Sequence, residues 1–93
     1  MAVTRTANTI TCTALNDAVA GQFKITGVVY AGATTAAHVC EIKDGYAGSG
    51  NSLFYAKSAA NGFNPLGPVK IMTDPTGFKV TTLQSGQVTV YIE

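Results

Sequence analysis

The chain contains a single histidine, His38, and this is the first side chain to consider for catalysis. A hydrolase would need a nucleophile and an orienting carboxylate beside the imidazole. Ser52, Asp44 and Glu41 are available in the same half of the chain, but no spacing singles any of them out. A histidine at the start of a strand more often serves as a structural hydrogen-bonding group. The sequence therefore predicts no catalytic residues and a protein that is not an enzyme.

A glycine-rich run between residues 45 and 52, Gly-Tyr-Ala-Gly-Ser-Gly-Asn-Ser, raises the question of phosphate binding. Phosphate loops combine backbone amides with a lysine or with a third glycine at a fixed spacing, and they lead into a helix. This run has neither feature and precedes an expected strand. It is therefore interpreted as a flexible hairpin loop, with no cofactor.

Carboxylates are the next candidates, as a catalytic pair or as calcium ligands. The chain has only five of them: Asp17, Glu41, Asp44, Asp74 and Glu93. Three lie in or beside expected turns, where aspartate accepts hydrogen bonds from the backbone. We expect that structural role for them, and no metal site.

The two cysteines, Cys12 and Cys40, both fall at inward positions of expected strands. A buried free thiol behaves there as a small apolar side chain. Together with one distant histidine they do not supply the four ligands of a zinc site. A disulfide between them would require neighbouring strands at the right distance, and in a chain without an export signal we expect free thiols.

Composition indicates an assembled protein. Charged residues make up 12% of the 93 residues, against about 25% in an average soluble domain. Small uncharged residues take their place, and such a surface suits faces that are covered by neighbours. The formal net charge is +1 and the six cations are scattered along the chain, so nucleic acid is not an expected partner. No run approaches the roughly 18 apolar residues of a membrane span, so no membrane partner is expected either.

Apolar and polar residues alternate with period two in several segments, as in half-buried strands. The expected strands are 9–14, 22–31, 38–43, 52–57, 69–73, 78–83 and 87–93. The last three are interpreted as a meander, that is, a sheet of consecutive antiparallel strands against which the rest of the chain packs. No helical period is present. The sequence predicts an all-β fold, an antiparallel β-sandwich or small barrel of about seven short strands.

Two segments leave alternatives open. In strand 22–31, Ile25 and Val29 are expected on one face and Val28 and Tyr30 on the other, where this apolar pair is either the start of an interface or ordinary surface. Gly27 marks either a bulge or a close approach of the backbone. In the segment 58–68, the prolines argue against a regular central strand. Its apolar residues are expected to cover the end of the core, or else to contact a partner.

The whole chain is expected to form a single β domain, residues 1–93, with residues 1–8 as an extended N-terminal arm. Such an arm can be disordered in the free chain or can pair with the sheet edge of a neighbour. The candidate partner-contact residues are those of the arm after the first methionine: Ala2, Val3, Thr4, Arg5, Thr6, Ala7 and Asn8.

Three segments of the sequence support a family resemblance. They are residues 5–11, Arg-Thr-Ala-Asn-Thr-Ile-Thr; residues 32–38, Gly-Ala-Thr-Thr-Ala-Ala-His; and residues 86–92, Gly-Gln-Val-Thr-Val-Tyr-Ile. In these the chain resembles small virion proteins of tailed bacteriophages, among them head decoration (cement) proteins.

The resemblance implies a structural protein that binds the major capsid protein lattice of the assembled head and stabilises it, often as a trimer. It implies a location on the capsid surface of the virion after synthesis in the host cytoplasm. No functional residue transfers with it, because the class has no shared site motif that can be placed on this chain.

Two further functions remain open. The protein could instead be a tail, baseplate or fibre component of the virion. It could also be a carbohydrate- or ligand-binding β-sandwich, which would require Tyr30, Tyr46, Tyr55 and Tyr91 to converge on one groove. The chain has no tryptophan, the usual platform for stacking a sugar.

Overall fold

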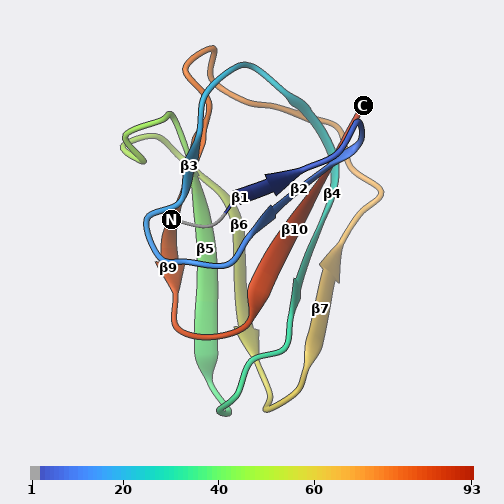
Figure 1. Ribbon diagram of the computed structural model, residues 1–93, viewed down its shortest axis with the longest axis vertical. Coiled ribbons are helices and arrows are strands. Elements are labelled where there is room, and N and C mark those ends of the chain that lie inside the picture. Colours follow the sequence, from blue (N-terminus) through green and yellow to red (C-terminus); the bar gives the residue numbers. More distant parts are fainter. Residues whose placement is uncertain (1–2) are drawn as a thin grey trace.

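The computed structural model describes residues 3–93, which form two antiparallel sheets packed face to face (Figure 1). Sheet A contains, in spatial order, β1 (Val3–Arg5), β2 (Thr9–Cys12), β10 (Gln87–Ile92), β4 (Lys24–Ala31) and β7 (Phe63–Leu66), and β8 (Ile71–Met72) pairs with another part of β4. Sheet B contains β3 (Ala18–Val19), β9 (Phe78–Leu83), β5 (His38–Asp44) and β6 (Ser52–Ser58). The prediction of an all-β sandwich is confirmed.

The core lies between the two sheets and follows from the alternation along each strand. In β10, Val88 and Val90 are fully buried, while Thr89 between them faces outward. The opposite wall is supplied by sheet B, where Ile42 and Val80 are also fully buried. At one end, Phe23 and Phe78 pack edge to face, with ring centroids 6.0 Å apart, a favourable geometry for two aromatic rings.

Strand β4 shows where simple alternation fails. Tyr91 of β10 lies opposite Gly27, but the next residue, Ile92, lies opposite Ile25, so one extra residue is inserted in β4. A bulge of this kind reverses the phase of the strand. Val28 and Tyr30 are therefore buried together with Ile25, whereas Val29 faces outward. The predicted faces of this strand are wrong beyond the bulge. The extra residue is Thr26, next to Gly27, which was named as the candidate site.

The predicted C-terminal meander is also wrong. Its three strands are present, but β8 and β10 belong to sheet A and pair with β4. Strand β9, which lies between them in sequence, belongs to sheet B and pairs with β3 and β5. The chain thus crosses from one layer to the other twice in this region, because each strand pairs with partners that are distant in sequence.

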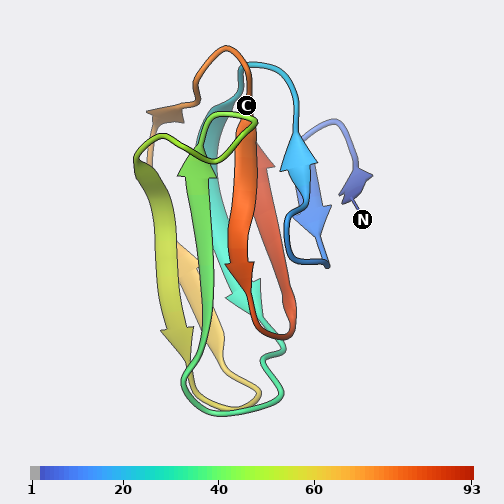
Figure 2. The same cartoon turned by 90° about the vertical axis from the view of Figure 1, so that its left-hand side faces the viewer.

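Three short strands were not predicted, namely β1, β3 and β7. All three lie at sheet edges. Strand β7 includes Pro65, which has no backbone N–H to donate and is therefore tolerated at an edge. Figure 2 shows β6 and β7 on the same side of the sandwich, away from the N-terminal strands.

Cys12 and Cys40 are free, fully buried and part of the core, as expected. Burial raises the pKa of the Cys12 thiol to about 12, and burial followed by the nearby Cys12 raises that of Cys40 to about 12. The ordinary value is 9.0. A thiol with so high a pKa is almost entirely protonated at neutral pH, so it is a poor nucleophile.

We therefore expect the folded protein to lose stability in alkali. A raised folded-state pKa stabilises the fold below the unfolded pKa, and this contribution disappears as pH rises from about 9 towards 12. Each thiol contributes a slope of roughly 1.4 kcal/mol per pH unit in that window. Urea titrations at several pH values measure the slope, and Cys40→Ala should reduce it. An identical slope in Cys40→Ala would contradict this explanation.

Candidate interaction surfaces

The outer face of sheet A is lined mainly by threonine. Alternation directs Thr9 and Thr11 of β2 away from the core, because Ile10 and Cys12 are buried. The strand register then aligns Thr4, Thr11, Thr89, Val29 and Pro65 in one row across five strands. The Thr11 and Thr89 hydroxyl oxygens are 3.2 Å apart and share a hydrogen bond. We name the outward residues Thr4, Thr9, Thr11, Val29, Thr89 and Tyr91 the threonine face.

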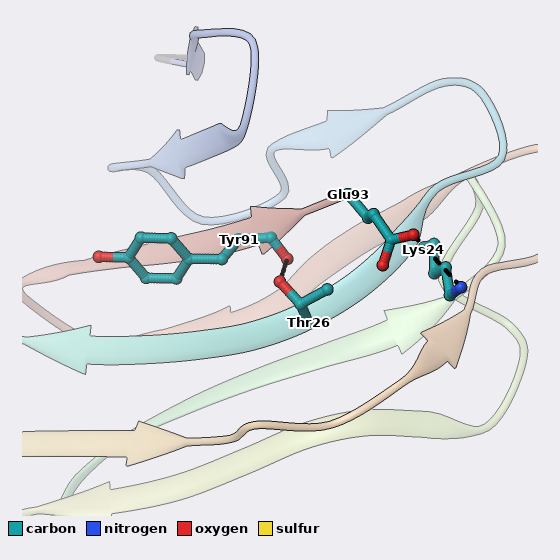
Figure 3. A network of polar contacts seen from close by, with 4 residues as sticks. All are labelled: Lys24, Thr26, Tyr91 and Glu93. Carbon is teal, nitrogen blue, oxygen red and sulfur yellow. Dashed lines mark hydrogen bonds and ion pairs between the residues drawn. The ribbon is translucent and has the colours of Figure 1, made fainter.

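Tyr91 is the large apolar side chain of the threonine face, and it is 42% exposed. Its cross-strand neighbour is Gly27, where an added Cβ would lie 3.8 Å from the Tyr91 ring. The ring therefore covers a position that has no side chain of its own. The bulged residue Thr26 donates its hydroxyl hydrogen to the Tyr91 carbonyl oxygen over 3.3 Å (Figure 3).

Besides Arg5 of β1, the charged side chains of sheet A lie where β4 begins and just after β10. There the Lys24 ammonium lies 3.5 Å from the Glu93 carboxylate (Figure 3). Both side chains are substantially exposed, so this pair adds little stability. None of the residues that form the threonine face is charged. The face is therefore a neutral, mostly β-branched surface bounded by one ion pair.

The outer face of sheet B is different in character. Glu41, Lys43, Lys57 and Lys79 occupy outward positions on its strands, and Lys43 lies directly opposite Lys79. The cations are scattered in the sequence, but the register gathers three of the six on this face. Sequence reasoning missed this grouping, because it depends on which strands pair. The two faces of the sandwich thus differ sharply in charge.

The predicted N-terminal arm forms part of sheet A. Residues Val3–Arg5 pair with β2 of the same chain, and Thr4 belongs to the threonine face. The connection is a tight turn in which the Thr9 amide donates to the Thr6 hydroxyl over 3.1 Å. Arg5 reaches across the sandwich edge, with its guanidinium carbon 5.0 Å from the centre of the Phe23 ring. Of the other predicted contact residues, Ala7 and Asn8 are exposed in the turn, and Ala2 lies outside the described residues.

His38 does not contact the partners considered from sequence. Its Nδ1 atom lies 2.7 Å from the hydroxyl of Ser85. That hydroxyl also accepts a hydrogen bond from the Thr34 amide, and the Ser85 carbonyl accepts one from Tyr30. The histidine is thus tied to a turn between strands. Ser85 was recognisable in the sequence only as a turn residue.

The aspartates contact backbone amides, as expected. The Asp44 carboxylate accepts from the Asp74 amide over 2.6 Å. Asp74 in turn accepts from the amide and the hydroxyl of Thr76, and these two hydrogen bonds lower the pKa of the Asp74 carboxyl. Within residues 3–93, no group of three or more histidine, cysteine, aspartate or glutamate side chains is arranged to hold a metal ion.

A groove separates the edge strands β6 and β7. Its volume is about 440 Å³, and it is lined by Leu53, Phe54, Tyr55, Ala56, Phe63, Asn64, Pro65 and Leu66. Leu66 packs partly against the core, whereas Phe63 is 68% exposed and Tyr55 is 61% exposed. Leu66 thus covers part of the core, as the first alternative for the 58–68 segment expects, whereas Phe63 is not packed against the core. No signal in the sequence could place β6 beside β7.

The four tyrosines do not converge on one groove. Tyr30 is fully buried, and Tyr46 is in the loop after β5. Tyr55 and Tyr91 lie on the outer faces of different sheets. The arrangement required for sugar stacking by all four is absent from this fold.

These features define a small antiparallel β-sandwich with one neutral and one charged face. Comparison with known proteins finds no family model, curated protein or solved structure that matches the chain. In the part of the chain that the structure describes, no helix of the length and apolar character needed to span a membrane is found.

Proposed function

We propose that this protein is a capsid decoration protein of a tailed bacteriophage, which binds the assembled head through its threonine face and stabilises the shell. The proposal rests on the difference in charge between the outer faces of the two sheets. The threonine face has no charged side chain, whereas Glu41, Lys43 and Lys57 lie on the opposite face. The family resemblance described above supplies the class of partner.

The physical reason lies in the cost of desolvation. Charged groups lose hydration when an interface forms, so interface centres are depleted of them. Threonine and valine on a flat sheet can be covered at small cost, and Tyr91 adds an aromatic contact of the type common in interfaces. The charged face of sheet B then remains in solvent and keeps the particle surface soluble.

A trimer would strengthen such binding. Three copies around a local three-fold position of the lattice would present three threonine faces together. Avidity then converts weak individual contacts into tight attachment, without new contacts within any single copy. The N-terminal residues take part in this proposal through Thr4, which lies in the same row as Thr11 and Thr89.

The test is to place a charge on the threonine face. Thr4→Arg and Thr89→Arg are each expected to weaken binding to emptied heads of the encoding phage at least about tenfold, because the new charge must be desolvated. Co-sedimentation with the heads measures the affinity. Thr82→Arg is the matched control, since Thr82 lies opposite Glu41 on the outer face of sheet B.

Equal binding by all three variants would contradict the role of the threonine face. If the unaltered protein binds isolated tails and ignores heads, the capsid assignment fails and a tail component is indicated. Thermal unfolding of each variant is measured alongside, because a loss of binding counts only when the fold is retained.

A further inference from the structure

We propose that the groove between β6 and β7 binds an extended, uncharged polypeptide segment of a partner protein, which adds as a further strand to the free edge of β6. This inference is independent of capsid binding by the threonine face, because it concerns a different surface. It would hold equally for a partner in the head, in the tail or outside the virion.

Unpaired backbone is the first argument. Among the strands of residues 3–93, β6 pairs only with β5 and β7 pairs only with β4, so each leaves one edge without a strand neighbour. A free edge presents N–H and C=O groups that an extended peptide can satisfy. Pro65 removes one donor from the short β7, whereas β6 is seven residues long and contains no proline. β6 is therefore the edge that can accept a strand of roughly 23 Å.

The side chains around the groove provide the second argument. Phe54 and Ala56 face inward from β6, and Leu66 faces them from β7. At the rim, Tyr55 and Phe63 are the two most exposed of the large apolar side chains in the described chain. An added strand would insert every second side chain between these residues, as the two-residue period of a strand requires.

Asn64 provides the third argument. Its side-chain oxygen is buried at the groove and has no hydrogen-bond partner. A buried polar atom without a partner destabilises the state that contains it, because its lost hydration is not replaced. A bound segment carries backbone N–H groups into the groove, and a small rotation of the Asn64 amide would bring its oxygen to one of them. Binding would thus remove a cost that the free protein bears.

Charge and area identify the kind of occupant. None of the eight lining residues is charged, so a charged segment would lose hydration without compensation. A second copy of the chain is disfavoured by area, since a stable interface needs about 800 Å² from each partner. That is about one sixth of this protein's 4756 Å² surface. Such an interface involves roughly 20–30 residues on each side, whereas eight residues line the groove. A single extended segment fits.

The experiment uses a capped heptapeptide of alternating threonine and valine as the ligand and ¹⁵N-labelled protein as the reporter. We expect saturable amide shifts confined to β6, β7 and their immediate neighbours, with a Kd on the order of 0.1–1 mM. Shifts spread over the threonine face, or no saturable shift in this range, would overturn the proposal.

Two N-methylated peptides distinguish strand addition from simple apolar contact. One carries N-methyl groups on the threonines and the other on the valines, so each removes the donors from one edge of the peptide. Strand addition predicts that one of them loses binding at least about tenfold and the other retains it. Equal affinities for the two peptides would contradict pairing with β6.

A protein variant tests the groove itself. Ala56→Leu fills part of the groove and is expected to weaken peptide binding several-fold, whereas Ala36→Leu, in the exposed turn before β5, should not change it. If Ala56→Leu binds as the unaltered protein does, the groove is not the site. If that variant fails to fold, the comparison of the N-methylated peptides still decides the question.

Discussion

Gly77→Ala is expected to destabilise the protein by about 3 kcal/mol or more. Gly77 has a φ of +118°, a backbone conformation that residues with a side chain rarely adopt. It is buried, and an added Cβ would collide with the carbonyl oxygen of Val19 and lie 3.0 Å from the Cα of Ala20. Both obstacles are backbone, which cannot move aside by a change of rotamer. The β3 edge of sheet B would have to shift.

Gly45→Ala separates the cost of the positive φ from the cost of the collision with backbone atoms. Gly45 also has a positive φ, +86°, but the nearest atom to an added Cβ is the Thr76 hydroxyl oxygen at 3.9 Å. This variant should therefore lose only the conformational cost, about 1 kcal/mol. Urea unfolding followed by circular dichroism gives both values. Equal losses for the two variants would show that the contact with Val19 is not the cause.

Asp17→Ala is the second substitution with a large expected effect, again about 3 kcal/mol. Asp17 is fully buried. Its carboxylate accepts hydrogen bonds from the Thr13 and Ala14 amides over 3.2 and 3.1 Å, and its carbonyl accepts from the Val80 amide over 2.8 Å. Alanine would leave the turn amides without this acceptor. The connection between β2 and β3 would then lose its attachment to the carboxylate.

The matched variant is Asp17→Asn, which has nearly the same shape and retains one side-chain oxygen as acceptor. We expect it to lose clearly less stability than Asp17→Ala. Chemical denaturation measures the difference, and amide hydrogen exchange at residues 13 and 14 locates it. A loss as large for asparagine as for alanine would mean that the negative charge, and not the acceptor geometry, stabilises this turn.

Much of this fold is encoded locally. Alternation in segments such as 87–93 predicts both the strand and its buried residues, because each side chain's face depends only on its neighbours in the same strand. The inward positions of Cys12 and Cys40 were predicted in the same way. The structural role of the aspartates also follows from local turn chemistry.

Local alternation and turn chemistry could not predict which strands pair with each other. The choice between a meander and the observed crossing of β9 into sheet B depends on partners 34 or more residues away, such as Cys40 opposite Leu83. The bulge at Thr26 is set by its pairing with β10, so the sequence indicated its place through Gly27 but not its effect on Val28 and Tyr30.

The candidate surfaces, too, were only partly predictable from the sequence. The outward threonines of β2 were visible from the sequence, whereas their alignment with Thr89 and Val29 is a property of register. The groove was not predictable, because it requires β6 and β7 to be the edges of two different sheets on the same side.

The position of β10 has a consequence for folding during synthesis. This strand lies between β2 and β4 and pairs with both, so sheet A cannot close until residues 87–92 have left the ribosome. Until then, Val28 and Tyr30 and the unpaired edges of β2 and β4 are open to other nascent chains. Contacts so distant in sequence form slowly. Rapid production from a strong promoter is therefore expected to favour aggregation, and slower translation to favour soluble protein.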